Sequence, residues 1–278
     1  MSGRARLLLA SLAVAACSRK PVLVTSEDGP PPAPLEGLPV TFAPVPAAPA
    51  LPGSGPFYEP DRMGKAVLMR RFDGPNILYA GLGREACEAE LVRRAIPVEH
   101  APETPDVVTP VWLRGPLHGV TIRSQLAPKV RLRSPFEIFD CRLLLAVDDF
   151  AALLAEHDVA EVIHLSAHRP RASNGCLPNA AATQHCGGLA LDVGSFRKKD
   201  GAVLEIDRDF HGKVGGSTCA GISKPKPPSP AATELWTIVC DAAARALFHV
   251  ILTPNTNREH KNHLHLEVTP NAAWMLVH

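Results

Sequence analysis

Large hydrophobic residues recur at helical intervals in three parts of the chain. Residues 140–157 show the pattern most clearly, because their apolar side chains fall on one face of a helix: Leu143, Ala146, Phe150 and Leu154. Asp140 stands at the position where a side-chain oxygen caps the first turn. The same spacing predicts two further helices, over 84–95 and 229–248.

Shorter apolar or alternating runs predict strands. They occur in seven stretches: 107–113, 118–122, 160–167, 188–196, 202–206, 249–253 and 263–268. The polar segment KKDG (198–201) separates two of these runs and predicts a hairpin turn. Helices mixed with antiparallel hairpins in this way predict an α+β fold, with a small, mostly antiparallel sheet flanked by helices.

The first residues follow neither pattern. A basic start, MSGRAR, precedes the apolar run LLLASLAVAA, which is shorter than the roughly 20 residues that span a bilayer. Residues 1–16 are therefore predicted to be an export signal peptide. The run ends VAAC and resembles a bacterial lipobox, which implies a lipidated Cys17; Ser18 in place of Asp implies an outer-membrane destination. The alternative is a cleaved signal peptide followed by a cysteine without lipid.

Residues 17–64 have the composition of a tether. The stretch 21–60 holds 12 of the 28 prolines of the chain and few large apolar residues. Such a sequence cannot bury enough surface to offset its ordering entropy, so we expect a disordered, extended linker. It would let a folded domain of residues 65–278 work away from the membrane that holds the lipid.

Charge and cysteine content narrow the partners and the compartment. The 29 basic and 28 acidic side chains leave a net charge of +1, without the basic excess typical of nucleic-acid binding. Six cysteines remain beyond Cys17, and an even number in an exported chain predicts disulfides. Cys176–Cys186 and Cys219–Cys240 would close short loops, although the spacing does not choose a connectivity. A thiolate zinc site is the alternative, but the chain has no CxxC motif.

Two histidine-containing motifs carry the candidate chemistry. TQHCGGLALD places His185 seven residues before Asp192, and HKNHLHLEV, near the end of the chain, holds three histidines. Alternate residues of a strand share a face, so His263 and His265 point the same way and can meet the first motif if the two strands are neighbours. Two imidazoles and a carboxylate with an open fourth position form a known catalytic zinc set. Alone, each residue reads as a surface or hydrogen-bonded group.

The motifs resemble those of two related groups of proteins. TQHCGGLALD is similar to the S-x-H-x-x-G-x-A-x-D pattern of the lysostaphin/D-Ala-D-Ala peptidase/hedgehog superfamily of zinc proteins, with Thr183 in place of Ser, and HLH matches its terminal H-x-H. NREHKNHLHLEV, CEAELVRRAIPV and LSAHRPRASNG together resemble the bacterial extensin-like C-terminal domain family, over roughly residues 85–270. An insert at 215–230 and Glu267, where Asp is common, depart from that family's pattern.

The resemblance implies a zinc peptidase-like domain over residues 65–278 in which His185, Asp192 and His265 ligate Zn²⁺. It also implies that His263 lies beside the metal as a candidate catalytic residue. An imidazole there can polarise a water molecule or stabilise an oxyanion.

Further positions near the motifs are candidates for catalysis or for shaping the site. His260 or Glu259 can supply a base, since Asn262 stands where superfamily members often carry a Glu. Arg169, which LSAHRPRASNG retains, can hold a substrate carboxylate in a bidentate contact; a surface ion pair is the alternative. Gly188 can let the backbone pass close to a crowded site.

These expectations lead to three functional hypotheses. The first is a periplasmic zinc-dependent amide hydrolase that acts on peptidoglycan peptides and is held to a membrane of the cell envelope by lipidated Cys17. The second is a non-catalytic zinc or cell-wall-binding domain, which the missing Glu favours. The third is a structural lipoprotein held by disulfides, with its histidines on the surface. Zinc content separates the third from the others, and turnover of cell-wall sacculi separates the first two.

Overall fold

The computed structural model describes five ranges of the compact unit formed by residues 52–278: 67–69, 74–170, 184–220, 223–272 and 274–278. Seven strands of the described main sheet lie side by side in this order: β1 (Val67–Met69), β11 (Met275–Val277), β9 (Val250–Leu252), β10 (Leu264–Glu267), β7 (Ala190–Lys198), β6 (Val159–Ser166) and β4 (Thr121–Ser124). An eighth, β8 (Val203–Glu205), pairs with β7. Neighbours run antiparallel, except that β9 is parallel to β11 and β4 to β6.

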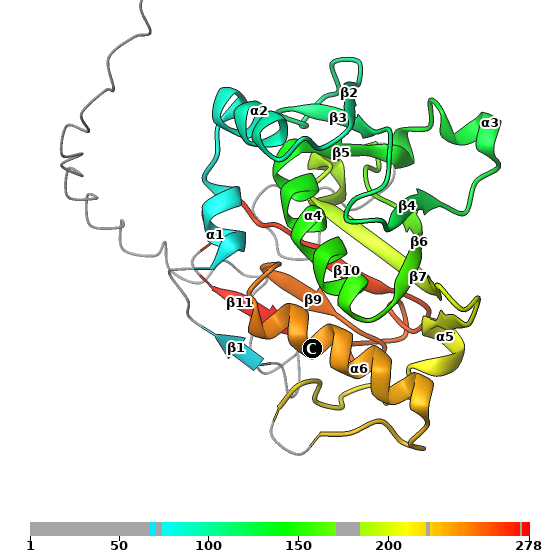
Figure 1. The fold of residues 1–278 in the computed structure, drawn as a ribbon. Helices are drawn as coiled ribbons and strands as arrows, with labels where there is room; N and C mark the ends of the chain where they lie inside the picture. The colour runs from blue at the N-terminus through cyan, green and yellow to red at the C-terminus, as the bar shows by residue number, and fades with distance from the viewer. Residues whose placement is uncertain (1–66, 70–73, 171–183, 221–222, 273) are drawn as a thin grey trace, which may run out of the picture. The chain divides into compact units, whose positions relative to one another are not determined.

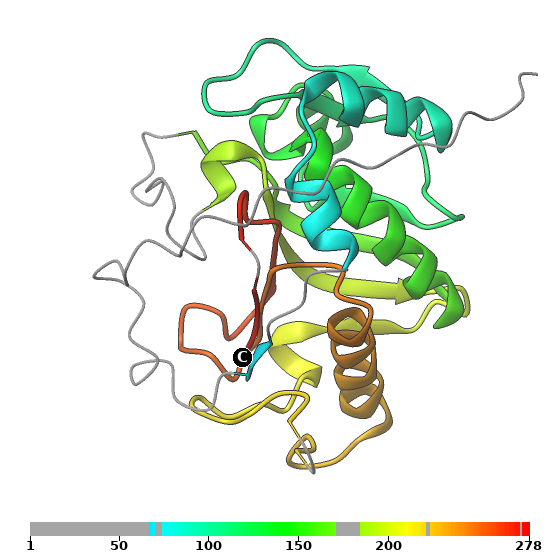
Figure 2. The same ribbon diagram turned by 90° about the vertical axis from the view of Figure 1, so that its left-hand side faces the viewer.

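Two long helices lie against one face of this sheet (Figure 1, Figure 2). Helix α4 (Cys141–Glu156) begins after Asp140, whose carboxylate accepts a backbone N–H of the first turn, as predicted. Helix α6 (Pro230–Ala244) begins after Ser229, whose hydroxyl accepts the N–H of Ala232. Such caps satisfy backbone donors that have no partner inside the helix, and each contributes about 1 kcal/mol.

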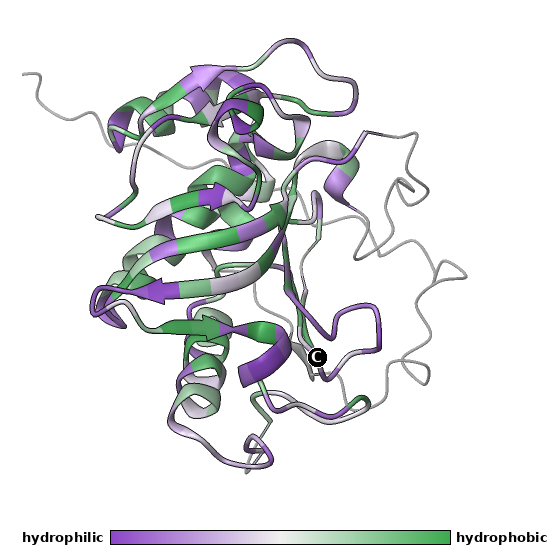
Figure 3. Ribbon diagram, turned by 90° about the vertical axis from the view of Figure 1, so that its right-hand side faces the viewer, coloured by the Kyte–Doolittle hydropathy of each residue, from purple (hydrophilic) through white to green (hydrophobic). Residues whose placement is uncertain are grey.

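The apolar core lies between these helices and the sheet. The ring of Phe150 on α4 meets Phe196 of β7 and Phe248 edge-on, at centroid distances of 6.2 and 5.6 Å. Burial of each such side chain contributes about 1.5–3 kcal/mol. Figure 3 shows apolar residues along the middle of β6 and β7 and polar residues at the hairpin between β7 and β8. The helix-covered face holds the core, which leaves the other face of β7 and β10 for polar side chains.

A second, three-stranded antiparallel sheet precedes α4 in the chain. Its strands are β2 (Val98–His100), β3 (Pro110–Leu113) and β5 (Ile138–Asp140). Strand β5 runs directly into α4, so this small sheet fixes the point where the central helix starts. The other described elements are short, apart from α2: α1 (Pro75–Ala80), α2 (Arg84–Arg93), α3 (Pro128–Arg131), η2 (Pro135–Glu137), η3 (Gln184–Gly187) and α5 (Ile206–Asp209).

The predicted α+β fold with a mostly antiparallel sheet is confirmed, and so are the three helices predicted from spacing. The strand predicted over 118–122 was misplaced, because β4 begins only at Thr121. His118 and Gly119 have positive φ angles of 49° and 82°, so they turn the chain rather than extend it. Strand β4 therefore begins three residues later than predicted.

Two disulfides join described elements, as the even cysteine count predicted. Cys219–Cys240 is one of the two short loops suggested by the sequence, and it ties the segment before α6 to that helix. Cys87–Cys141 was not foreseen; it links α2 to the first residue of α4. Cys176, part of the other suggested pair, lies outside the described residues.

The predictions for the beginning of the chain also lie outside the described residues. They concern the signal peptide (1–16), the tether (17–64) and the lipid at Cys17. None of the helices in the described ranges combines the length and the apolar character that crossing a bilayer demands.

Candidate metal centre

Two neighbouring strands bring the two halves of the centre together. Strands β7 and β10 pair antiparallel, with His265 opposite Asp192. Leu191 and Val193, on either side of Asp192, lie in the hydrophobic core. Because successive residues of a strand point to opposite faces, Asp192 projects from the face that the helices do not cover, and His265 projects beside it.

A short 3₁₀ turn, η3, brings the third residue to the same place. The Nδ1–H of His185 donates to the carbonyl of Ala167 at 2.7 Å, which leaves Nε2 to face Asp192 Oδ1 at 3.0 Å. The chain then leaves η3 through Gly188, whose φ is +62°. A Cβ at Gly188 would come within 2.9 Å of the backbone nitrogen of Asp140. The close backbone passage predicted for this glycine is present, and it fixes the turn that carries His185.

The three side chains together offer ligand atoms at metal-binding distances. One atom each from His185, Asp192 and His265 lies within 4.8 Å of the others, and all three residues are buried. His265 Nδ1 is 3.1 Å from Asp192 Oδ1, close to the 3.0 Å of His185 Nε2. Ligands about 2.1 Å from a tetrahedral zinc ion lie about 3.4 Å apart. The set therefore fits a tetrahedral cation with small adjustments.

A carboxylate behind His265 selects which imidazole nitrogen faces the centre. His265 Nε2–H donates to Glu267 Oε2 at 3.0 Å, and the Thr269 hydroxyl donates to Glu267 Oε1 at 2.7 Å. In the neutral ring, this hydrogen bond leaves the lone pair on Nδ1, the nitrogen that faces Asp192. A carboxylate in this position is a common outer partner of a metal-bound histidine.

The electrostatic field at the centre favours positive charge. Burial alone would raise the pKa of Asp192, but the charges and hydrogen bonds of His185 and His265 hold it well below its usual value. Burial would likewise lower the pKa of His265, but its bonds to Asp192 and Glu267 prevail and raise it to about 9. The two carboxylates thus hold a cation between them, and a divalent metal ion would satisfy the same field.

The other two histidines of the second motif lie next to these ligands. His263 Nε2 is 3.6 Å from Asp192 Oδ1, while its Nδ1 is 2.9 Å from Asn262 Oδ1. The His260 ring centre is 5.1 Å from that of His263, and its Nδ1–H donates to Asn257 Oδ1 at 2.8 Å. Burial, with the neighbouring imidazoles, lowers the pKa of His260 to about 3, and burial also lowers that of His263. Both are therefore neutral imidazoles at neutral pH.

Arg169 reaches the centre from the end of β6. Its guanidinium Nη2 donates to the outer oxygen of Asp192, and its Nε donates to the Ser166 hydroxyl at 2.9 Å. The side chain is 42% exposed. The structure thus places Arg169 at the site but in contact with a candidate ligand, and its contact with a substrate carboxylate stays a prediction.

All six site residues singled out from the sequence therefore meet, whereas one partner was missed. Glu267 drew attention only as an unusual residue, although it lies on the same strand face as His263 and His265, two residues further on. That alternation was the available signal. Glu259, the alternative base, is exposed in the preceding loop, and its backbone N–H donates to Asn257.

Comparison with known proteins gives one match. The family described as extensin-like protein C-terminus matches residues 85–276, which is more than half of the chain. No curated protein and no solved structure matches the chain. The matched range contains both histidine motifs and every strand that builds the centre.

Proposed function

The chain belongs to the extensin-like C-terminal family, and from this premise we propose that it is a zinc-dependent hydrolase that cuts amide bonds in peptidoglycan peptides. The observation that carries the proposal is the convergence of His185, Asp192 and His265 on one point, with ligand atoms within 4.8 Å. The similarity of the two motifs to those of the lysostaphin/D-Ala-D-Ala peptidase/hedgehog superfamily supports zinc as the metal and an amide as the bond.

In this proposal, three residues hold the metal and two support them. His185 would bind through Nε2, Asp192 through Oδ1 and His265 through Nδ1. Three protein ligands leave one position open, as in other catalytic zinc sites. When bound, zinc would lower the pKa of a water molecule to about 7 and polarise the substrate carbonyl. The reaction breaks the C–N bond and adds the hydroxyl of water to the carbonyl carbon and its hydrogen to the nitrogen.

His263 is the residue best placed to move the proton. Its Nδ1–H donates to Asn262, so Nε2 carries the lone pair and faces Asp192 Oδ1 at 3.6 Å. A neutral imidazole in that position can take a proton from water and then give it to the departing amine. The ring of His260, 5.1 Å from that of His263, lies beside it as a neutral neighbour. Arg169 pairs with Asp192 and, being partly exposed, can also meet a substrate carboxylate.

The proposed location follows from the beginning of the sequence. A lipid on Cys17 would hold the protein to a membrane of the cell envelope, with the outer membrane favoured by Ser18. The Pro-rich tether would let the domain reach peptidoglycan on the periplasmic side. The substitution Cys17→Ala should move the protein from the membrane fraction to the soluble fraction; partitioning that does not change would refute the anchor.

Metal analysis and turnover of purified sacculi test the function. His265→Ala should lose zinc and activity together, because it removes a ligand. His263→Ala should keep most of the zinc and lose about 10²- to 10⁴-fold in turnover, because it removes proton transfer or charge stabilisation only. The matched control is His100→Ala, an exposed histidine of the small sheet, which should change neither. Equal zinc loss in both site variants would mean that His263 is a ligand.

A second function is favoured by one observation. Asn262 occupies the position where superfamily members often carry a Glu, and its side chain bonds His263 rather than offering a base. A zinc or cell-wall-binding domain without turnover would fit that substitution. Zinc binding and sacculus binding by a parent protein that releases no peptide fragments would favour this reading.

A further inference from the structure

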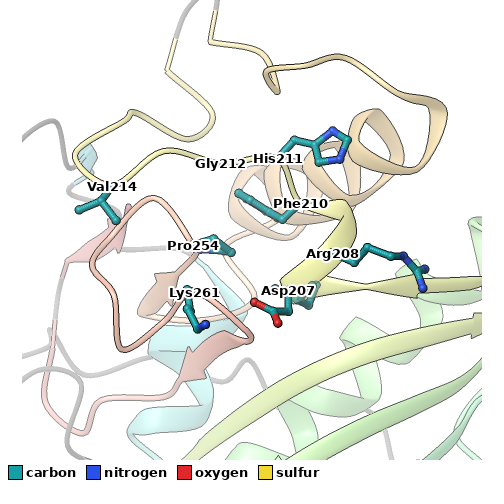
Figure 4. Close-up of a pocket in the computed structure, with 9 residues that line it drawn as sticks. Asp207, Arg208, Phe210, His211, Gly212, Val214, Pro254 and Lys261 are labelled. Atoms are coloured by element: carbon teal, nitrogen blue, oxygen red, sulfur yellow. The ribbon is translucent and has the colours of Figure 1, made fainter.

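A hollow of about 240 Å³ lies beside the second histidine motif (Figure 4). One wall consists of α5 and the segment after it, and the other is the loop between β9 and β10. The residues that line it are Ile206, Asp207, Arg208, Phe210, His211, Gly212, Val214, Pro254 and Lys261. None of them belongs to the metal centre.

The hollow is built rather than a chance gap between loops. Asn255, which is 1% exposed, joins the two walls: its Oδ1 accepts the N–H of Lys213 at 2.6 Å, and its Nδ2 donates to Thr218 Oγ1 at 2.8 Å. A Cβ at Gly212 would lie 2.5 Å from the same Oδ1, so only glycine allows this approach. Cys219–Cys240 then fastens the segment to α6. The insert at 215–230 therefore follows directly on Val214, the last lining residue of this wall.

Two opposite charges point into the hollow without meeting each other. Figure 4 shows the Asp207 carboxylate and the Lys261 ammonium directed toward the space between the walls. In the described ranges neither side chain makes a hydrogen bond or ion pair. Arg208 points away and is held by Asp209 and Glu205. Both side chains are exposed, so a cation and an anion remain available to a ligand.

The loop connects the hollow to the metal centre. Lys261 directly follows His260 and stands two residues before His263, a distance of at most about 7 Å along the backbone. One residue of an extended peptide spans about 3.3–3.6 Å. A peptide bound at the centre would therefore reach the hollow within a few residues.

We propose that the Asp207–Lys261 pocket, defined by the lining residues above, binds the zwitterionic end of a diamino acid side chain in the peptide substrate. The ammonium of that end would meet Asp207, and its carboxylate would meet Lys261. This inference rests on the proposed function, because it names the part of a peptidoglycan peptide that the protein recognises. A ligand with one charge would leave the other pocket charge without a partner, so the pair selects for both.

Calorimetric binding to the zinc-loaded full chain tests the pocket. The probe is a synthetic L-alanyl-γ-D-glutamyl-diaminopimelate peptide, whose side chain ends in an ammonium and a carboxylate. Lys261→Met and Asp207→Asn should each weaken binding about tenfold, the usual scale for a hydrogen bond to a charged group. Arg208→Gln is the matched control: it lines the same hollow but points away, and should bind as the parent does.

Capped probes identify which charge meets which residue. Amidation of the side-chain carboxylate should weaken binding to the parent about tenfold and cause no further loss in Lys261→Met. Acetylation of the side-chain ammonium should likewise weaken binding to the parent about tenfold and cause no further loss in Asp207→Asn. If the loss from capping a charge and the loss from the matching substitution add in full, the proposed pairing of that charge with that residue is wrong. Equal affinity of all variants, or no binding to the parent, would overturn the pocket.

The outcomes separate this inference from the proposed hydrolysis. Binding that depends on Lys261 and Asp207 in a protein that cuts no bond would refute the hydrolase and support the pocket. Cleavage with a KM that is unchanged by either capped probe and by either substitution would support the hydrolase and refute ligand binding in the pocket.

Discussion

Asp140, ahead of α4, and Asp192, on β7, are both buried carboxylates, yet their surroundings have opposite character. Asp140 accepts backbone N–H groups from Val108, Thr109 and Arg142 and two guanidinium bonds from Arg142. Every one of these donors carries its proton at any ordinary pH. The Asp140 region is therefore a closed set of permanent bonds that fixes where β5 ends and α4 begins.

Three of the side chains that face Asp192 are imidazoles, whose protons can leave. Its Oδ1 faces the imidazoles of His185, His265 and His263 at 3.0, 3.1 and 3.6 Å, while its other oxygen bonds Arg169. Each imidazole that loses its proton here presents a lone pair beside the carboxylate. The difference shows that the partners of a buried acid, rather than its burial, mark it as structural or as a binding site.

The largest expected effect concerns the structural aspartate. Asp140→Asn should lower the free energy of unfolding by about 3–5 kcal/mol, because it leaves the buried Arg142 guanidinium without its counter-charge. Urea denaturation measures the loss. The folded fraction should still bind zinc in the parent ratio. Asp158→Asn, at an exposed ion pair with Lys199, is the control and should cost less than about 1 kcal/mol.

Asp192→Asn should have a large effect on zinc affinity and a smaller effect on stability. Zinc affinity should fall by more than about 100-fold, the upper range for outer partners of a metal site, because a ligand is lost. The metal-free protein should lose less stability than Asp140→Asn does, since Arg169 is partly exposed and the imidazoles can release their protons. Chelator competition and urea denaturation measure the two quantities. A stability loss as large as that of Asp140→Asn would erase the distinction drawn here.

A smaller effect on zinc affinity is expected for Glu267, which bonds the ligand His265. Glu267→Gln should weaken zinc binding by about 10- to 100-fold, because the amide no longer holds the Nε2–H of His265 with a full negative charge. Chelator competition gives the value. Glu205→Gln, an exposed residue of β8, is the matched control. Unchanged zinc affinity in Glu267→Gln would show that the charge of Glu267 does not help His265 to bind the metal.

The smallest effect concerns an imidazole that burial keeps neutral. His249 donates Nε2–H to Ala272 and accepts the N–H of Thr269, and burial lowers its pKa from 6.5 to about 4. The unfolded chain therefore takes up the proton first, so this stabilisation is complete above pH 6.5 and is lost as the pH falls toward 4. Between pH 7 and 5 the parent should lose about 1–2 kcal/mol that His249→Gln does not lose. Urea denaturation of the parent and of His249→Gln at pH 7 and pH 5 measures the loss. A difference in unfolding free energy between the two proteins that is the same at both pH values would contradict the prediction.

The sequence predicted the elements whose signals are local. Helix α4, its cap at Asp140 and the β7–β8 hairpin follow from spacing and turn residues over short windows. The histidine motifs could be joined because strand alternation places side chains without knowledge of the whole fold. The convergence at the centre was thus accessible, whereas zinc itself stays a prediction.

The rest depended on pairings between distant segments. The small sheet has strands of three or four residues, too short to show a period, and the run 107–113 pairs only from Pro110 because Val108 and Thr109 bond Asp140 instead. The Cys87–Cys141 disulfide depends on how α2 lies against α4, which cysteine spacing does not encode. The Asp207–Lys261 pocket likewise needs two loops that meet only in the folded chain.

The order of strands in the main sheet also determines when the metal ligands can come together during synthesis. Strand β10 is next to last along the chain, but it lies between β7 and β9 in the sheet, and β11 pairs with β1, the first described strand. A chain that is made from its N-terminus therefore has His185 and Asp192 long before His265 arrives. Contacts between such distant segments form late, because loop closure must precede them. The complete set of ligands exists only after nearly the whole chain has been synthesised, so a nascent chain would hold metal weakly.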